Sequence, residues 1–153
     1  MRIFKLILAV ALMMFVVNSS ALAARHSTPE EMRYALNESV HVVRKTDGYF
    51  SIFSNNPDYG VLHSQLEICR SSLRKIQSIR ELDLVGGREA RTCVALALII
   101  LLNRESFLEH CISAVQARLR KDDEDFRYYH QKAMADYAEA EKWRAKFKAD
   151  YGY

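Results

Sequence analysis

Apolar residues recur at steps of three and four through most of the chain beyond residue 28, which is the spacing of one face of an α-helix. Glycine and proline are scarce and stand between these segments, where they mark helix boundaries. The pattern predicts a first helix at about residues 29–45, a second at about 57–82, a third beginning near 88 and a last one at about 122–151. We therefore expect an all-α fold, a small bundle of about four helices.

The predicted helix ends rest on capping chemistry. A capping side chain followed by proline, as in Thr28-Pro29 and Asn56-Pro57, suits a helix start, because proline at the first helical position needs no amide partner. Asp47-Gly48 is expected to end the first helix. Asp122 or Asp123 is expected to cap the last one.

The third helix contains the most apolar stretch of the chain. Ten consecutive residues without a polar side chain run from Cys93 to Leu102, so this stretch is expected at the centre of the core. The polar residues 103–106 then interrupt the pattern, which resumes at Phe107. Either one long helix continues through them or the chain bends there, and the lack of glycine and proline favours continuation.

The N-terminus has the three zones of a secretory signal peptide. Arg2 and Lys5 give a positive start, the run from Ile3 to Val17 is almost wholly apolar, and small residues follow at Ala21-Leu22-Ala23-Ala24. The apolar run is too short for a membrane span, which needs roughly 20 residues. We expect residues 1–24 to be cleaved, which leaves residues 25–153 as a single helical domain with no stable membrane span, secreted or periplasmic.

Charge excludes one broad class of partner. The formal net charge of +3 falls to +1 when the signal segment is removed, because Arg2 and Lys5 are its only charged residues. Binding to phosphate backbones is driven by clustered positive charge, and no basic face is evident. We therefore expect no nucleic-acid partner.

Export changes how the three cysteines are interpreted, because disulfides persist in oxidising compartments. We expect a link between Cys69 and Cys93 across the hairpin of the second and third helices. If the chain bends near Asn103 instead, Cys93 and Cys111 become the bonded pair. Buried free thiols are the remaining alternative.

The sequence offers no convincing catalytic, cofactor or metal motif. The five histidines stand on separate segments without metal-ligand spacing: His26, His41, His63, His110 and His130. No cysteine has a fixed histidine or Asx partner, and the acidic clusters suit helix starts better than a cleft. We therefore expect no catalytic residues, no bound metal and no cofactor.

Aromatic residues are concentrated between the first two predicted helices. Tyr49, Phe50 and Phe53 fall in the predicted connection at residues 46–56, and Tyr59 follows it. Such side chains either pack onto the end of the bundle or form a contact surface, and long connections often carry recognition. We take these four residues as the predicted binding surface.

Together these patterns predict an exported, non-enzymatic interaction protein of helical-bundle type, whose partner is another protein of unknown identity. The alternative is a helical carrier of a metal or small ligand that uses histidines buried between facing helices.

Overall fold

The described residues form four helices, as predicted, and one helix end differs from its predicted position by more than two residues. The computed structural model describes residues 30–53, 58–81 and 87–152, with the side chains of residues 48–53, 80 and 81 outside that description. Its helices are α2 (Glu30–Phe53), α3 (Tyr59–Glu81), α4 (Gly87–Leu119) and α5 (Asp123–Tyr151). No strand occurs in these described ranges, so the predicted all-α bundle is confirmed. The proposed signal peptide and the start at Thr28-Pro29 lie outside the described residues. The predicted start of the second helix at Pro57 is two residues early, because Asp58 is not helical and its Oδ1 accepts a hydrogen bond from the amide of Val61 at 3.1 Å, which makes Asp58 the cap of α3.

Capping fixes both ends of α5. The side chain of Asp122 accepts a hydrogen bond from the amide of Asp125 at 3.0 Å, which satisfies one of the free amides at the helix start. At the other end Gly152 adopts a left-handed backbone with φ of 70°, and its amide donates to the carbonyl of Lys148. The predicted start at Asp122 or Asp123 and the end near Tyr151 are confirmed.

The first helix does not end at Asp47-Gly48 as predicted, because α2 continues to Phe53. A glycine inside a helix costs only about 1 kcal/mol relative to alanine, which tertiary contacts can offset. Just before the glycine, Thr46 is buried and Asp47 forms an ion pair with Arg104 of α4. These contacts hold the backbone in helical form through Gly48. The predicted aromatic loop is therefore wrong, since Tyr49, Phe50 and Phe53 stand on the last turns of α2.

The third predicted helix continues through its polar residues, as favoured from the sequence. α4 runs without interruption from Gly87 to Leu119, and Arg104, in the middle of the polar patch, has no exposed surface. The side-chain amide of Asn103 donates to the carbonyl of Ile99, one turn earlier. The polar residues 103–106 therefore lie within a continuous helix and do not form a turn.

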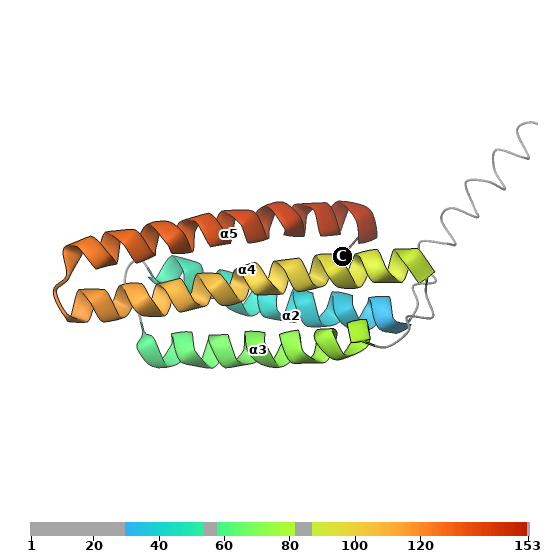
Figure 1. The fold of residues 1–153 in the computed structure, drawn as a ribbon, viewed down its shortest axis with the longest axis horizontal. Coiled ribbons are helices and arrows are strands. Elements are labelled where there is room, and N and C mark those ends of the chain that lie inside the picture. Colours follow the sequence, from blue (N-terminus) through green and yellow to red (C-terminus); the bar gives the residue numbers. More distant parts are fainter. Residues whose placement is uncertain (1–29, 54–57, 82–86, 153) are drawn as a thin grey trace, which may run out of the picture.

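The four helices run alternately up and down, with α4 in the middle (Figure 1). α2, α3 and α5 each pack on α4, and α2 also packs on α3, whereas α2 and α5 scarcely touch. Buried apolar residues from all four helices form one cluster around α4. The α4–α5 hairpin extends past the ends of α2 and α3 (Figure 1).

Candidate functional site

An open groove of about 740 Å³ lies where α2 and α5 fail to pack together. We call it the α2–α5 groove. It is lined by one outer side of α2 and by the end of α5: Leu36, Asn37, Val40, His41, Arg44, Lys45, Tyr151 and Gly152. Leu36, Val40 and Tyr151 are half-buried, and the five other lining residues are more exposed. The groove therefore has an apolar floor with a polar rim.

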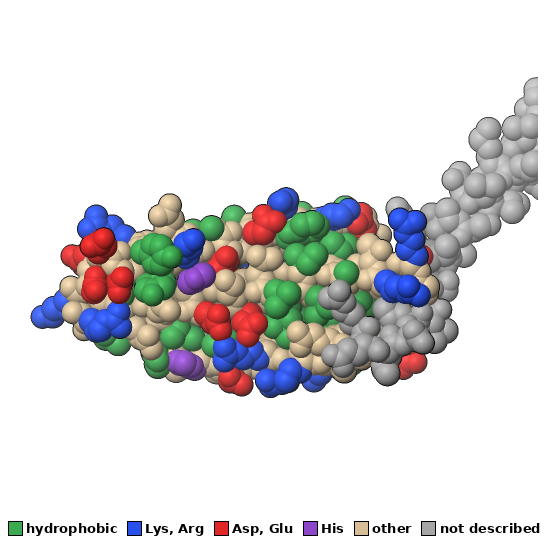
Figure 2. All heavy atoms as spheres, viewed as in Figure 1, with side chains coloured by type: hydrophobic (Ala, Val, Ile, Leu, Met, Phe, Trp, Pro, Cys, Tyr) green, Lys and Arg blue, Asp and Glu red, His purple; other side chains and the backbone are tan. Residues whose placement is uncertain are grey.

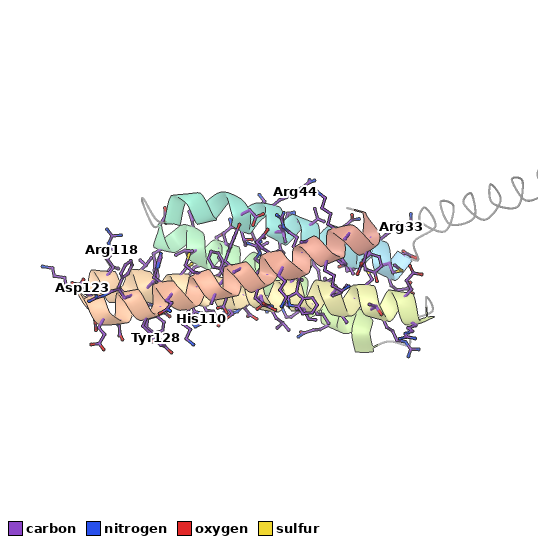
Figure 3. All side chains as sticks on the ribbon, turned by 90° about the horizontal axis from the view of Figure 1, so that it is seen from above. Arg33, Arg44, His110, Arg118, Asp123 and Tyr128 are labelled. Atoms are coloured by element: carbon purple, nitrogen blue, oxygen red, sulfur yellow. The ribbon has the colours of Figure 1, made fainter. Side chains whose placement is uncertain are left out.

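The rim of the α2–α5 groove is positively charged. Arg44 and Lys45 are exposed on α2, His41 stands one turn before them, and no carboxylate is among the described lining residues. Neither Arg44 nor Lys45 forms an ion pair with any residue in the described ranges. Figure 3 shows Arg44 at the outer edge of the bundle. The positive charge of the rim is therefore not neutralised by described side chains.

A buried charged cluster lies beyond one end of this groove, and we call it the Arg104 network. It joins three helices through Asp47 of α2, Arg104 of α4 and the α5 residues Tyr137, Glu141 and Arg144. Arg104 Nη2 lies 2.8 Å from Asp47 Oδ1 and also contacts Glu141 Oε1. Arg144 Nη2 contacts the other oxygen of Glu141 at 2.6 Å. The network fixes α5 relative to α2 where apolar contact between them is missing.

Burial of the charged side chain of Arg104 carries a desolvation cost that its neighbours must offset. Its side chain is fully buried, and among the described residues Nε and Nη1 have no hydrogen-bond partner. Its guanidinium carbon lies 4.6 Å from the centroid of the Tyr137 ring, so the face of the ring partly compensates the charge. Burial raises the pKa of Tyr137, and the nearby carboxylate of Asp47 adds to that rise. Sequence reasoning placed residues 103–106 in a polar patch and missed this network.

A second polar cluster couples α4 to α5 through one carboxylate oxygen. Ser106 Oγ donates to Asp136 Oδ2 at 2.7 Å, and His110 Nδ1 lies 2.6 Å from the same atom. In a hydrolase triad the histidine lies between the hydroxyl and the acid and removes the hydroxyl proton. Here the acid lies between the other two, so the hydroxyl of Ser106 is not activated by His110. The arrangement orients side chains between the helices.

This cluster was also missed from the sequence. Ser106 and His110 are four residues apart and therefore share a face of α4, which is visible from the sequence alone. Their partner Asp136 is on another helix, and only the α4–α5 register brings it to them. Figure 2 shows one face of the molecule, on which acidic, basic and apolar side chains are interspersed.

The predicted disulfide between Cys69 and Cys93 is wrong, because all three cysteines are free and buried. Cys69 Sγ lies 3.3 Å from the carbonyl oxygen of Leu101, eight residues further along α4 than Cys93. At 1.5 Å per residue this offset is about 12 Å, far more than a disulfide spans. Cys93 Sγ instead lies 4.0 Å from the carbonyl oxygen of Met32 on α2. The Cys93–Cys111 alternative is also excluded, since both residues lie on the uninterrupted α4.

The buried thiols are poor nucleophiles. Burial raises the pKa of Cys69 to about 12, and the carboxylate of Glu105 adds to the rise. Burial likewise raises the pKa of Cys93 to about 12 and raises that of Cys111 as well. Because the thiolate is the reactive form, all three side chains are held in the unreactive state at neutral pH.

The histidines do not meet in the bundle interior. His41 and His63 are exposed, whereas His110 and His130 are half-buried on α4 and α5; His26 lies outside the described residues. Within the described ranges, no group of three or more His, Cys, Asp or Glu residues is arranged to hold a metal ion. The premise of the carrier alternative, histidines buried between facing helices, is not met by His41 or His63.

Of the four residues predicted to bind a partner, only Tyr59 has a described side chain. Tyr59 stands at the start of α3 and is 39% exposed. Its hydroxyl accepts a hydrogen bond from Gln116 at 2.8 Å, and its ring meets His63 edge-on at a centroid distance of 4.4 Å. Tyr59 thus connects α3 to α4. The side chains of Tyr49, Phe50 and Phe53 lie outside the described residues.

No protein-family model, curated protein or solved structure matches this chain. No helix in the described part of the chain is long and apolar enough to cross a membrane. The fold and the sites above are therefore interpreted from their own chemistry.

Proposed function

We propose that this chain is an exported, non-enzymatic binding protein and that the α2–α5 groove is its binding surface. The observation that carries the proposal is the groove itself. Two helices of the bundle stand apart and leave the half-buried side chains of Leu36, Val40 and Tyr151 along an open channel. Concave surfaces with an apolar floor and a few polar groups are the usual form of binding sites.

The state of the reactive side chains supports a binding role over catalysis. The three thiols are buried with raised pKa values, and the hydroxyl of Ser106 is bound to Asp136 instead of to a base. The carboxylates of Asp47 and Glu141 are taken up by Arg104 and Arg144. The thiols are thus buried, and the hydroxyl and carboxylates are bound by neighbouring side chains.

The groove is a better candidate than the aromatic residues first proposed. Tyr59 is bound to Gln116, and the helical course of α2 removes the long connection that motivated the choice of Tyr49, Phe50 and Phe53. By contrast, the cationic side chains of the groove rim project into solvent without described partners. Groups of this kind are available to a second molecule.

Site-specific photo-cross-linking in the producing cell tests the proposal. A photoreactive amino acid in place of Asn37, an exposed residue of the groove, is expected to give a defined cross-linked product. The same group in place of Gln77, an exposed residue of α3, is expected to give none. Absence of a product from position 37, or equal products from both positions, contradicts a binding role for the groove.

A pair of valine substitutions provides the matched control. Val40→Arg places a long charged side chain on the groove floor and is expected to remove the product formed at position 37. Val61→Arg makes the same change at an exposed site of α3 and is expected to leave that product in place. Loss of the product in both variants would point to a general loss of fold.

Export is tested separately by the mass of the mature protein. The small residues after the apolar run predict that the mature chain begins at Ala24 or Arg25. Intact-mass measurement of the protein from the producing cell decides this point. A product that still carries residues 1–17 contradicts cleavage.

A further inference from the structure

We propose that the occupant of the α2–α5 groove is an acidic amphipathic helix supplied by another protein. This inference rests on the proposed function and adds the chemistry of the partner. It is carried by the shape of the groove, the sign of its charge and the depth of its floor.

The shape of the groove suits a helix. Tyr151 and Gly152 at the C-terminal end of α5 border one side of it, and its long wall on the other side is α2, whose lining residues span positions 36 to 45. That stretch is about 14 Å long at 1.5 Å per residue, or two and a half helical turns. Leu36 and Val40 are one turn apart and form a short ridge of the kind that packs into the groove of a neighbouring helix. A helix would therefore lie along the α2 wall, as in other helix-in-groove complexes.

The charge of the rim selects an acidic helix. His41 precedes Arg44 and Lys45 by three and four residues, one helical turn, and no carboxylate is among the described lining residues. The pocket between α2 and α3 differs, because Glu30, Glu31 and Lys75 line it together. Unbalanced positive charge is thus a property of the α2–α5 groove and not of α2 as a whole. Charges at the rim of an interface act mainly on association rate and partner choice, so they favour acidic partners.

The depth of the floor favours a helix over an anionic lipid. Lipid-like ligands are usually bound in pockets that enclose most of their surface. The floor of this groove consists of three half-buried side chains, and the groove is open to solvent along its length. Such a surface covers one face of a bound molecule, which is what an amphipathic helix presents. Anionic lipid remains an outcome that the experiment separates.

The test uses three synthetic peptides with the same leucine pattern. Each is about 15 residues long, so that a helix can form, with leucine at every third or fourth position. The flanking positions carry glutamate in the first peptide, glutamine in the second and lysine in the third. Affinity is measured by titration calorimetry with the mature protein, and backbone amide shifts locate the binding. The glutamate peptide is expected to bind at least about tenfold more tightly than the glutamine peptide, with shifts on α2 and α5.

Matched charge reversals connect the binding to the groove. Arg44→Glu with Lys45→Glu is expected to weaken binding of the glutamate peptide by about tenfold. Arg74→Glu with Lys132→Glu produces the same change in net charge at exposed sites of α3 and α5 and is expected to leave affinity within about twofold. All four positions are exposed, so both double variants should fold. Equal weakening by the two pairs overturns the proposal.

Other outcomes also overturn it. These are equal affinity for the glutamate and glutamine peptides, preference for the lysine peptide, and binding to vesicles of phosphatidylcholine with phosphatidylglycerol that the Arg44 and Lys45 reversals abolish. The proposed function fails separately. If position 37 still gives its cross-linked product while the glutamate peptide does not bind, the groove binds a partner of another chemistry. If both fail, the groove is not the binding surface.

Discussion

α4 and α5 are two helices of similar length held in the molecule by different means. Sixteen residues of α4 are buried, and they cover more than half of the circumference of the helix. Only Ala133, Ala140 and Phe147 of α5 are buried, and they are spaced seven residues apart. A seven-residue spacing places them in one narrow seam against a neighbouring helix, with small alanines allowing close approach. The position of α4 thus depends on complete burial of many apolar side chains, whereas α5 has one fully buried seam flanked by half-buried side chains such as Phe126 and Tyr129.

Side-chain hydrogen bonds and ion pairs to α4 add directional contacts to the apolar packing of α5. Asp136 receives two side chains of α4, and Glu141 meets Arg104 from the same helix. Directional contacts of this kind fix the rotation and register of a helix in which only three side chains are fully buried. Because complete burial in α5 is confined to one seam, the rest of this helix is open to solvent or only half-buried.

Removal of a large side chain from the α4 core is expected to have the greatest effect. Phe107 is fully buried and meets the ring of Tyr137 edge-on. Phe107→Ala is expected to lower the free energy of unfolding by about 3–5 kcal/mol. Tyr128→Ala, which removes a 54% exposed ring from α5, is expected to change it by no more than about 0.5 kcal/mol. Denaturant titration measures both, and similar losses would contradict the contrast.

The Arg104 network is tested first by neutralising its carboxylates and then by also replacing Arg104. Asp47→Asn with Glu141→Gln leaves the buried guanidinium of Arg104 without a counter-charge and is expected to cost about 3 kcal/mol. Adding Arg104→Met to that variant is expected to recover most of the loss, because a buried apolar side chain needs no counter-charge. Unfolding titrations of the three variants and the parent complete the comparison. No recovery would mean that the acids stabilise α5 through other partners.

The aromatic residues at the end of α2 are expected to contribute to stability. In the sequence Tyr49, Phe50 and Phe53 follow Val42, Val43 and Thr46 by seven positions each, which is the spacing typical of one apolar helix face. Tyr49→Ser with Phe53→Ser is expected to lower the unfolding free energy by about 2 kcal/mol. In this double variant the yield of cross-linked product from position 37, divided by the amount of folded protein, is expected to be unchanged. Unchanged stability with loss of that product would restore these residues as the contact surface.

The buried thiols predict a loss of stability at alkaline pH. Burial raises the pKa of Cys69 from 9.0 to about 12, so above about pH 9 the unfolded chain releases a proton that the folded chain retains. The contribution of the Cys69 thiol to the free energy of unfolding is therefore fully present below about pH 9 and is lost as the pH rises toward 12. Between about pH 7.5 and pH 10 the unfolding free energy is expected to fall by about 1.4 kcal/mol less in Cys69→Ala than in the parent. An equal fall in both would contradict the raised pKa.

The sequence predicted the parts of this fold that depend on local chemistry. The capping acid at Asp122 was enough to place the start of α5, and the lack of glycine and proline at residues 103–106 was enough to favour an unbroken α4. The end of α2 was predicted wrongly because the local signal at Gly48 is weaker than the tertiary contacts of Thr46 and Asp47. A local sequence pattern contains the helix-ending preference of a glycine but not the ion pair that a neighbouring residue forms with a residue far along the chain.

The sites required the register between helices, which the sequence did not provide. Cys69 lies level with Leu101 and not with Cys93, and Asp136 reaches Ser106 only in the observed α4–α5 register. The α2–α5 groove depends on which helices do not pack on each other, a choice that amphipathic patterns leave open. Its basic residues were visible as residues of one helix, but nothing in the sequence indicated that this side would remain uncovered.

The alternating course of the helices also bears on how quickly the chain reaches this fold. Most interhelical packing joins α4 to α3 or α5, its neighbours in sequence, while the helices farthest apart in the chain scarcely meet. Chains dominated by such local contacts fold rapidly, because little loop-closure entropy opposes their formation. The limited packing between α2 and α5 thus leaves few contacts of large sequence separation to form, apart from those of Asp47 with α5. Refolding is expected to be fast, and a partner bound in the groove would stabilise the folded state further.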